Sequence, residues 1–156
     1  LIGIPFIPLL YFTSQGGRTT SLVKYSSSFK TADELNEHLR ALLTLTDSFQ
    51  TDKNARMLLT GYIEKHKDAC PEDDCPLRYR PSTKRRKHHE EKIATLEENV
   101  KRLLLAIDRF YVSGTKKFKN SVNLRIAFAF FLFERLKINK RALVEIQKAK
   151  EYNPDF

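Results

Sequence analysis

The sequence has few of the residues that mark several common protein classes. Only two cysteines and five glycines occur among 156 residues. A secreted disulfide scaffold needs four or more cysteines, so this count argues against one and favours a reducing compartment. The sequence contains no glycine-rich phosphate loop, nucleophile elbow or metalloprotease helix. We therefore predict no catalytic residue and no enzymatic activity.

No apolar run is long enough to cross a bilayer. Residues 1–12, LIGIPFIPLLYF, are almost wholly apolar, but a transmembrane helix needs about 20 such residues. The run also lacks the basic start and the small-residue cleavage site of a signal peptide. Because the sequence begins without Met, we expect the chain to be part of a longer polypeptide.

The composition indicates a folded, basic domain. Hydrophobic residues make up 41% of the chain, which argues against disorder throughout. A length of 156 residues suits one domain with a hydrophobic core. The formal net charge of +9 favours an anionic neighbour, such as nucleic acid, an anionic membrane surface or an acidic partner chain.

We divide the chain into a tail and a helical domain. Residues 1–30 join the apolar segment to a Ser-, Thr- and Gly-rich stretch, and are expected to form an apolar tail and extended arm, which the family resemblance described below implies is membrane-proximal. Residues 31–156 are expected to form an all-α, repeat-like domain with a Cys/His loop at 66–89. Thr31 and Glu34 give a capping-box signature at its start. Apolar residues at helical spacing predict five helices and little or no sheet, at about 31–50, 52–66, 83–118, 123–136 and 141–152.

Several details of these helices can also be anticipated. The second helix should end near His66, before Pro71. Gly114, inside the third helix, predicts a bend or a close helix contact. The fourth helix is apolar nearly all round, so we expect most of its faces to be buried. Asn139 is expected to take the left-handed conformation that ends the fourth helix.

Self-alignment at an offset of 36 residues reveals a repeated helical pattern. The small Ala106 falls on Ala142, and the bulky Phe110 falls on Ile146. This pattern resembles the second helix of a tetratricopeptide or half-a-tetratricopeptide unit, in which small residues allow close helix approach. We therefore expect antiparallel helical hairpins, packed through Ala106, Phe110, Ala142, Ile146 and Ala149.

Two stretches together resemble one known family. They are GYIEKHKDACPEDDCPL, from residue 61, and KKFKNSVNLRIAFAFFLFERLKINKRALVEIQKAKEYNP, from residue 116. With IGIPF near the start, they are similar to the region after the membrane-spanning part of the tiny macrocysts protein family of ciliates and other protists. The resemblance covers roughly the whole chain. It implies a cytoplasmic helical connector in a large multi-pass membrane protein, between the membrane and PAS-type sensory modules.

The Cys/His loop offers ligands for a metal ion. His66, Cys70 and Cys75 supply one imidazole and two thiols, all of them zinc ligands, and His88 or His89 would complete a tetrahedral site. A metal would order a proline-rich loop that has little hydrophobic means of ordering itself. Two alternatives stay open: packed, reduced thiols without a metal, or a disulfide between Cys70 and Cys75.

A basic run offers an anion-binding site, at Lys84, Arg85, Arg86 and Lys87. Near a membrane, such a run attracts anionic lipid headgroups. Nucleic acid is disfavoured as the partner, because aromatic residues for base stacking are not interleaved with the run. The alternative is a solvated helix start.

Three interpretations of function follow. The first is a non-enzymatic helical scaffold or signal-relay connector at the cytoplasmic face of a membrane, in contact with the rest of a larger polypeptide and with other protein chains. The second is an RNA-processing-type helical scaffold, since half-a-tetratricopeptide repeats also occur in such complexes. The third is a redox-responsive adaptor acting through Cys70 and Cys75. Zinc is the one cofactor that the residues suggest.

Overall fold

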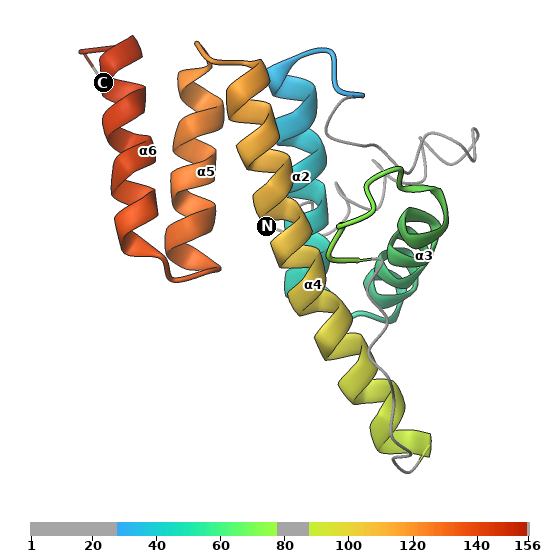
Figure 1. Cartoon of the computed structure of the whole chain (residues 1–156). Helices are drawn as coiled ribbons and strands as arrows, with labels where there is room; N and C mark the ends of the chain where they lie inside the picture. The colour runs from blue at the N-terminus through green and yellow to red at the C-terminus, as the bar shows by residue number, and fades with distance from the viewer. Residues whose placement is uncertain (1–27, 78–87, 156) are drawn as a thin grey trace. The chain divides into compact units, whose positions relative to one another are not determined.

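Five α-helices and their connections make up the described part of the chain (Figure 1). The computed structural model describes residues 28–77 and 88–155, with the backbone alone for 88–96. The helices are α2 (Ala32–Ser48), α3 (Lys53–Ala69), α4 (His88–Lys117), α5 (Val122–Glu134) and α6 (Asn139–Tyr152). No strand occurs within these ranges, so the all-α prediction is confirmed for them. Most of the predicted N-terminal arm and the residues just before α4 lie outside the described residues.

Side-chain caps define where several helices begin. The N–H of Glu34 donates to Thr31 Oγ1 at 3.1 Å, and the carboxylate of Glu34 accepts from the N–H of Lys30 at 3.0 Å. The Asp52 carboxylate accepts from the N–H of Asn54 at 2.9 Å, and Ser121 caps α5 in a similar way. Each cap satisfies a backbone donor that has no partner inside the helix. The Thr31 half of the predicted capping box is therefore present, whereas the Glu34 carboxylate bonds the N–H of Lys30 rather than that of Thr31.

The described residues fall into two compact units. The first comprises 39–77 and 88–106, and the second comprises 28–38 and 107–155. In the first unit, Leu42, Leu59 and Leu103 are completely buried. Such leucines recur at helical spacing along their helices, which is why the sequence pattern predicted those helices correctly.

Aromatic side chains dominate the core of the second unit. The ring of Phe29 lies 6.0 Å from that of Phe110 between centroids, in an edge-to-face arrangement. Tyr111 of α4 stacks on Phe128 of α5 at 5.0 Å, and its centroid lies 5.3 Å from that of Phe131. These offset and edge-on contacts are the favourable arrangements for aromatic pairs. They join the second part of α4 to α5.

Gly114 marks a close helix contact. The sequence analysis predicted either such a contact or a bend at this residue. A Cβ placed on this residue would overlap Cδ2 of Leu35, a buried residue of α2. The helix α4 continues past Gly114 to Lys117. Glycine is therefore present here because the two backbones approach closely, despite its cost in helix propensity.

The turn between α5 and α6 differs from the prediction at Asn139. The left-handed residue is Lys137, with φ of 57°, and Asn139 is instead the first residue of α6. The N–H of Ile138 donates to the C=O of Leu132 at 2.9 Å, which closes the chain around Lys137. The prediction for Asn139 was wrong because this hydrogen bond, rather than the conformational preference of asparagine, places the turn.

The helix α5 is less buried than its composition suggests. Phe128, Phe131 and Leu132 are buried, but Phe130 and Phe133 are 60% and 55% exposed. The expectation that most faces of α5 are buried was thus wrong for the face that carries Phe130 and Phe133. Among the described helices, none is both long enough and apolar enough to cross a membrane.

Candidate functional site

Three side chains with metal-binding chemistry meet where α3 ends. The helix continues to Ala69, one turn beyond the predicted end, and Cys70 caps it in an extended conformation that suits a residue before proline. The N–H of Cys70 donates to the C=O of His66 at 2.9 Å. The N–H of Cys75 donates to the C=O of Glu72 at 3.3 Å. Helix end and turn together bring the imidazole and both thiols to one place.

The resulting cluster of His66, Cys70 and Cys75 is compact and buried. One ligand atom from each residue lies within 4.8 Å of the other two. Cys75 Sγ lies 3.3 Å from Nε2 of His66, and the Tyr62 ring packs beside the imidazole with centroids 5.9 Å apart. Cys70 and Cys75 are not joined by a disulfide. The structure thus assembles three of the predicted metal ligands.

Burial controls the protonation of this cluster. It lowers the pKa of His66, against the opposing effect of Glu72, so the imidazole is neutral at neutral pH. Burial, together with a smaller effect of the nearby Cys75, raises the pKa of Cys70 to about 11. A protonated thiol is a poor nucleophile. Metal ligation requires the thiolate as well, so an ion bound at the cluster would displace the thiol proton of Cys70.

The predicted fourth metal ligand and the predicted anion-binding run lie outside the described side chains. His88 and His89 form the first turn of α4, but their side chains lie outside the described residues. The basic run of Lys84, Arg85, Arg86 and Lys87 also lies outside them.

The predicted helix-packing residues have mixed environments. Ala106, Phe110, Ala142 and Ala149 are buried, whereas Ile146 is only partly covered. Ala106 belongs to the first unit, and the other four belong to the second. The partial exposure of Ile146 has a clear reason, because this side chain lines an open groove.

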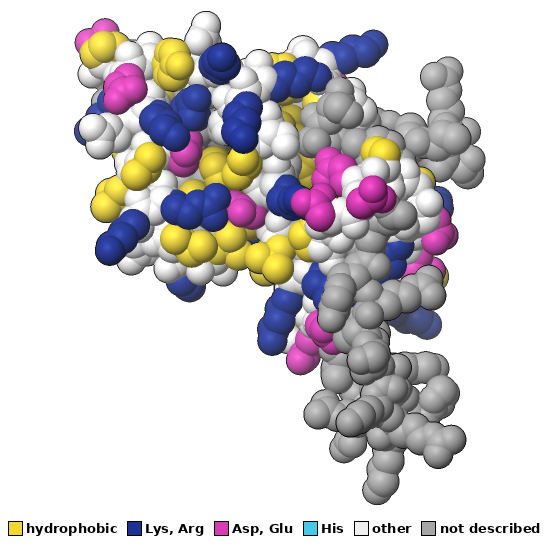
Figure 2. All heavy atoms as spheres, viewed as in Figure 1, with side chains coloured by type: hydrophobic (Ala, Val, Ile, Leu, Met, Phe, Trp, Pro, Cys, Tyr) yellow, Lys and Arg dark blue, Asp and Glu magenta, His cyan; other side chains and the backbone are white. Residues whose placement is uncertain are grey.

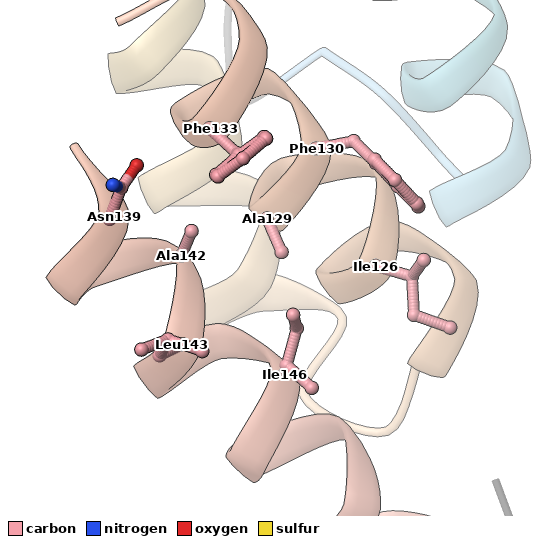
Figure 3. A pocket seen from close by; sticks show the side chains of 8 residues that line it. All are labelled: Ile126, Ala129, Phe130, Phe133, Asn139, Ala142, Leu143 and Ile146. Carbon is pink, nitrogen blue, oxygen red and sulfur yellow. The ribbon is translucent and has the colours of Figure 1, made fainter. Parts of the chain in front are cut away.

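The groove lies between α5 and α6, which run side by side (Figure 1). Its volume is about 580 Å³. Figure 3 shows side chains of both helices around the opening, among them Ala129 of α5 and Ala142 of α6. The lining is apolar except for one amide, and consists of Ile126, Ala129, Phe130, Phe133, Asn139, Ala142, Leu143 and Ile146.

A buried ion pair fixes α6 against α5. Arg125 Nη1 lies 2.9 Å from Oε2 of Glu145, and their side chains are only 9% and 11% exposed. The guanidinium also donates to the backbone C=O of Thr115 and of Lys119, each at 3.4 Å. Lys148 contacts the second carboxylate oxygen of Glu145 at 3.3 Å. The spacing of the two helices, and hence the shape of the groove, depends on this network.

Basic side chains surround the groove. Lys140 precedes Leu143 by three residues and Lys150 follows Ile146 by four, so both lie on the groove side of α6. Lys137 lies in the turn between the helices, and all three lysines are exposed. Figure 2 shows apolar side chains over α5 and α6 interspersed with Lys and Arg. Glu134, four residues after Phe130, is the acidic residue on the corresponding side of α5.

The sequence analysis missed the groove and the Arg125–Glu145 pair. One signal for the groove was present, since Leu143 and Val144 are apolar but fall outside the buried stripe of α6 formed by Ala142 and Ala149. Arg125 inside an apolar helix was a comparable signal for a buried pair. The sequence alone, without the arrangement of α5 and α6, does not show which residue pairs with Arg125 or which helix completes the groove.

Comparisons of this chain with protein-family models, with curated proteins and with solved structures gave no match.

Proposed function

We propose that this chain is a non-enzymatic helical scaffold whose α5–α6 groove binds an amphipathic helix from another protein chain. The apolar stripe of that helix is flanked by carboxylates. The observation that carries the proposal is the exposure of large apolar side chains along the groove: 60% for Phe130, 55% for Phe133 and 65% for Leu143. Contiguous exposed apolar surface of this kind is typical of interaction sites.

The shape and chemistry of the groove favour a helix as its occupant. Two adjacent helices leave an elongated depression, into which a third helix can place side chains at i, i+3, i+4 and i+7. Asn139 is the only polar side chain in the lining. A small-molecule site usually contains several polar groups that fix the orientation of its ligand. The lining is therefore better suited to an apolar helix face.

Charge favours an acidic helix over a basic one. Lys137, Lys140 and Lys150 stand at the groove, opposed there by Glu134. The whole chain carries a formal charge of +9. Carboxylates at the edges of the bound helix would therefore meet a complementary potential, which raises the association rate and suppresses basic competitors.

The packing of α5 and α6 also supports a tetratricopeptide-like or half-a-tetratricopeptide-like hairpin. Ala142 and Ala149 lie seven residues apart and are 3% and 0% exposed. Small buried residues at this spacing allow close helix approach, as in those repeats. In repeat proteins of this type, exposed helix faces bind other protein chains, which agrees with the proposed use of the groove.

The setting of the scaffold is a further part of the proposal. The resemblance to the tiny macrocysts family supports a connector at the cytoplasmic face of a multi-pass membrane protein. Peptide-mapping mass spectrometry of the native polypeptide tests this part. Apolar spans upstream of Leu1 and a sensory module downstream of Phe156 are expected. A native polypeptide without apolar spans would overturn the membrane setting and leave the groove proposal intact.

A binding titration tests the groove directly. The probe is a fluorescein-labelled helical peptide with leucines at i, i+3, i+4 and i+7 and glutamates beside them. Its anisotropy is followed as the chain is added. We expect saturable binding, several-fold tighter than that of a peptide with lysines in place of the glutamates. A proline-interrupted version of the glutamate peptide should not bind, because it cannot present a continuous apolar stripe.

Two surface variants provide the matched comparison. Leu143→Asp introduces a charge into the groove and should reduce affinity at least about tenfold, which corresponds to roughly 1.4 kcal/mol. Met57→Asp alters a side chain of α3 that is 64% exposed, almost the same as the 65% of Leu143, and should leave affinity unchanged. Equal affinity of all three proteins for the peptide would overturn the proposal.

A redox-responsive adaptor is the second candidate function. The thiols of Cys70 and Cys75 lie within 4.8 Å of each other in the buried cluster, so a small displacement would allow them to form a disulfide. Mass spectrometry after mild oxidation should find a Cys70–Cys75 crosslink. Peptide binding by the groove that is the same in the oxidised and the reduced chain would exclude this second candidate.

A further inference from the structure

The cluster at the end of α3 has the atoms and the geometry of a metal site. Tetrahedral zinc, with Zn–S of about 2.3 Å and Zn–N of about 2.0 Å, places its ligand atoms roughly 3.5 to 3.8 Å apart. Cys75 Sγ is 3.3 Å from Nε2 of His66, and all three ligand atoms lie within 4.8 Å of one another. Movements of a few tenths of an ångström up to about 1 Å would bring the three to coordination distance.

The local backbone already holds these ligands close together. His66 and Cys70 are linked through the last turn of α3, where the N–H of Cys70 meets the C=O of His66. Cys75 is held by the turn from Glu72, and the fully buried Leu77 anchors the chain just after it. A ligand set that is partly assembled loses less conformational entropy on binding than one that must be gathered from an open loop.

The ligand types indicate which ion would bind. Two thiolates and one imidazole form a borderline-soft set that favours zinc and disfavours magnesium or calcium, which prefer oxygen ligands. The turn between Cys70 and Cys75 carries Glu72, Asp73 and Asp74, whereas Lys65 and Lys67 flank His66 on α3.

We propose that His66 Nε2, Cys70 Sγ and Cys75 Sγ bind one zinc ion. Within the described residues, the cluster has three members and no fourth His, Cys, Asp or Glu joins it. The ion fastens the segment after α3 to the end of that helix. This structural role is separate from the groove and does not depend on it.

Metal analysis of the full chain, purified under reducing conditions, is the first test. We expect about one zinc per chain by inductively coupled plasma mass spectrometry. X-ray absorption should show two sulfur ligands at about 2.3 Å and two lighter atoms at about 2.0 to 2.1 Å. Cobalt added in place of zinc should give the visible bands of a tetrahedral thiolate site. A chain that binds neither ion at a saturating concentration would overturn the proposal.

Two substitutions in the same turn distinguish the loss of a zinc ligand from the loss of a nearby negative charge. Cys75→Ser keeps a side chain of similar size but should lose the stoichiometric zinc and the cobalt bands. Asp74→Asn removes a nearby charge and should retain both. Zinc bound equally by wild type and Cys75→Ser would contradict the assigned ligands.

A stability measurement covers the case in which Cys75→Ser folds poorly. Zinc in large excess over its dissociation constant should raise the wild-type Tm by on the order of 10 °C, and a chelator should reverse the rise. Asp74→Asn should respond in the same way as wild type. If the Tm of wild type is indifferent to both zinc and chelator, the ion has no structural role and the proposal fails.

Discussion

Arg125 shows how one charged residue can be accommodated in an apolar helix. Its guanidinium meets the Glu145 carboxylate at 2.9 Å and two backbone carbonyls at 3.4 Å. Desolvation of the two charges is offset only while all these partners are present. The residue is therefore tolerated because of the fold, and it in turn fixes the position of α6.

Removing one member of this pair should be costly. Arg125→Met leaves the Glu145 carboxylate buried with only the partly exposed Lys148 beside it, and should lower the free energy of unfolding by about 3 kcal/mol. The double variant Arg125→Met with Glu145→Leu should recover most of that loss, since no charge stays buried. Urea unfolding measures both.

A more exposed pair provides the control. Arg141 Nη2 lies 2.9 Å from Oδ1 of Asp108, and the Arg141 side chain is 42% exposed. Arg141 Nη1 also meets Oδ2 of Asp108, at 3.3 Å, so the pair is bidentate. Because Arg141 is partly exposed, Arg141→Met should cost about 1 kcal/mol, well below the loss from Arg125→Met. A loss as large as that of Arg125→Met, or a double variant no more stable than the single one, would contradict this account of the buried pair.

Two helical glycines should respond in opposite directions to the same substitution. No atom lies within 4 Å of a Cβ placed on Gly61, so Gly61→Ala should raise the free energy of unfolding by about 0.5 to 1 kcal/mol through helix propensity. At Gly114 the added methyl meets the buried Leu35. Gly114→Ala should lower the free energy of unfolding by about 1 kcal/mol, because overpacking exceeds the gain in propensity. Urea unfolding of both variants checks the signs, and stabilisation by Gly114→Ala would exclude the close contact.

At the scale of helices, zinc should affect the end of α3 selectively. The N–H groups of Cys70 and Cys75 make the local hydrogen bonds that hold the proposed ligands. Zinc should therefore slow amide hydrogen exchange in residues 69–77, with little change in α5 or α6. Mass spectrometry of peptic fragments, with and without a chelator, measures this. Identical exchange at 69–77 in both conditions would count against an ion at this position.

Local sequence patterns predicted the helices because their causes are local. Leucines at helical spacing and the Thr31–Glu34 cap specify α2 without reference to the rest of the chain. The same holds for His66 and Cys70, four residues apart at a helix end. Pro71 after Cys70 and the short turn to Cys75 bring the second thiol close, again within a few residues.

Features that depend on distant residues could not be predicted in this way. Arg125 and Glu145 are twenty positions apart, and their pairing requires the arrangement of α5 and α6. The groove depends on which face of α5 is left uncovered, and hydrophobic composition alone suggested that most faces would be buried. Lys137 takes the left-handed turn because of a hydrogen bond between Ile138 and Leu132, which a preference for asparagine does not reveal.

At the scale of the molecule, the two proposed sites belong to different units. The metal cluster lies in the first unit, and the groove lies in the second. Each can therefore be altered by point substitution without changing a residue of the other. The formal charge of +9 belongs to the chain as a whole and should assist the approach of acidic partners.

The most direct test of the scaffold proposal is an NMR titration of the isotopically labelled chain with the glutamate-flanked helical peptide. The account predicts the largest methyl shifts at Ile126, Leu143 and Ile146, which line the groove, and unchanged signals from Met57 and Leu59 of α3. Shifts confined to the first unit, or none at saturating peptide, would contradict the central claim that this chain is a scaffold acting through the α5–α6 groove.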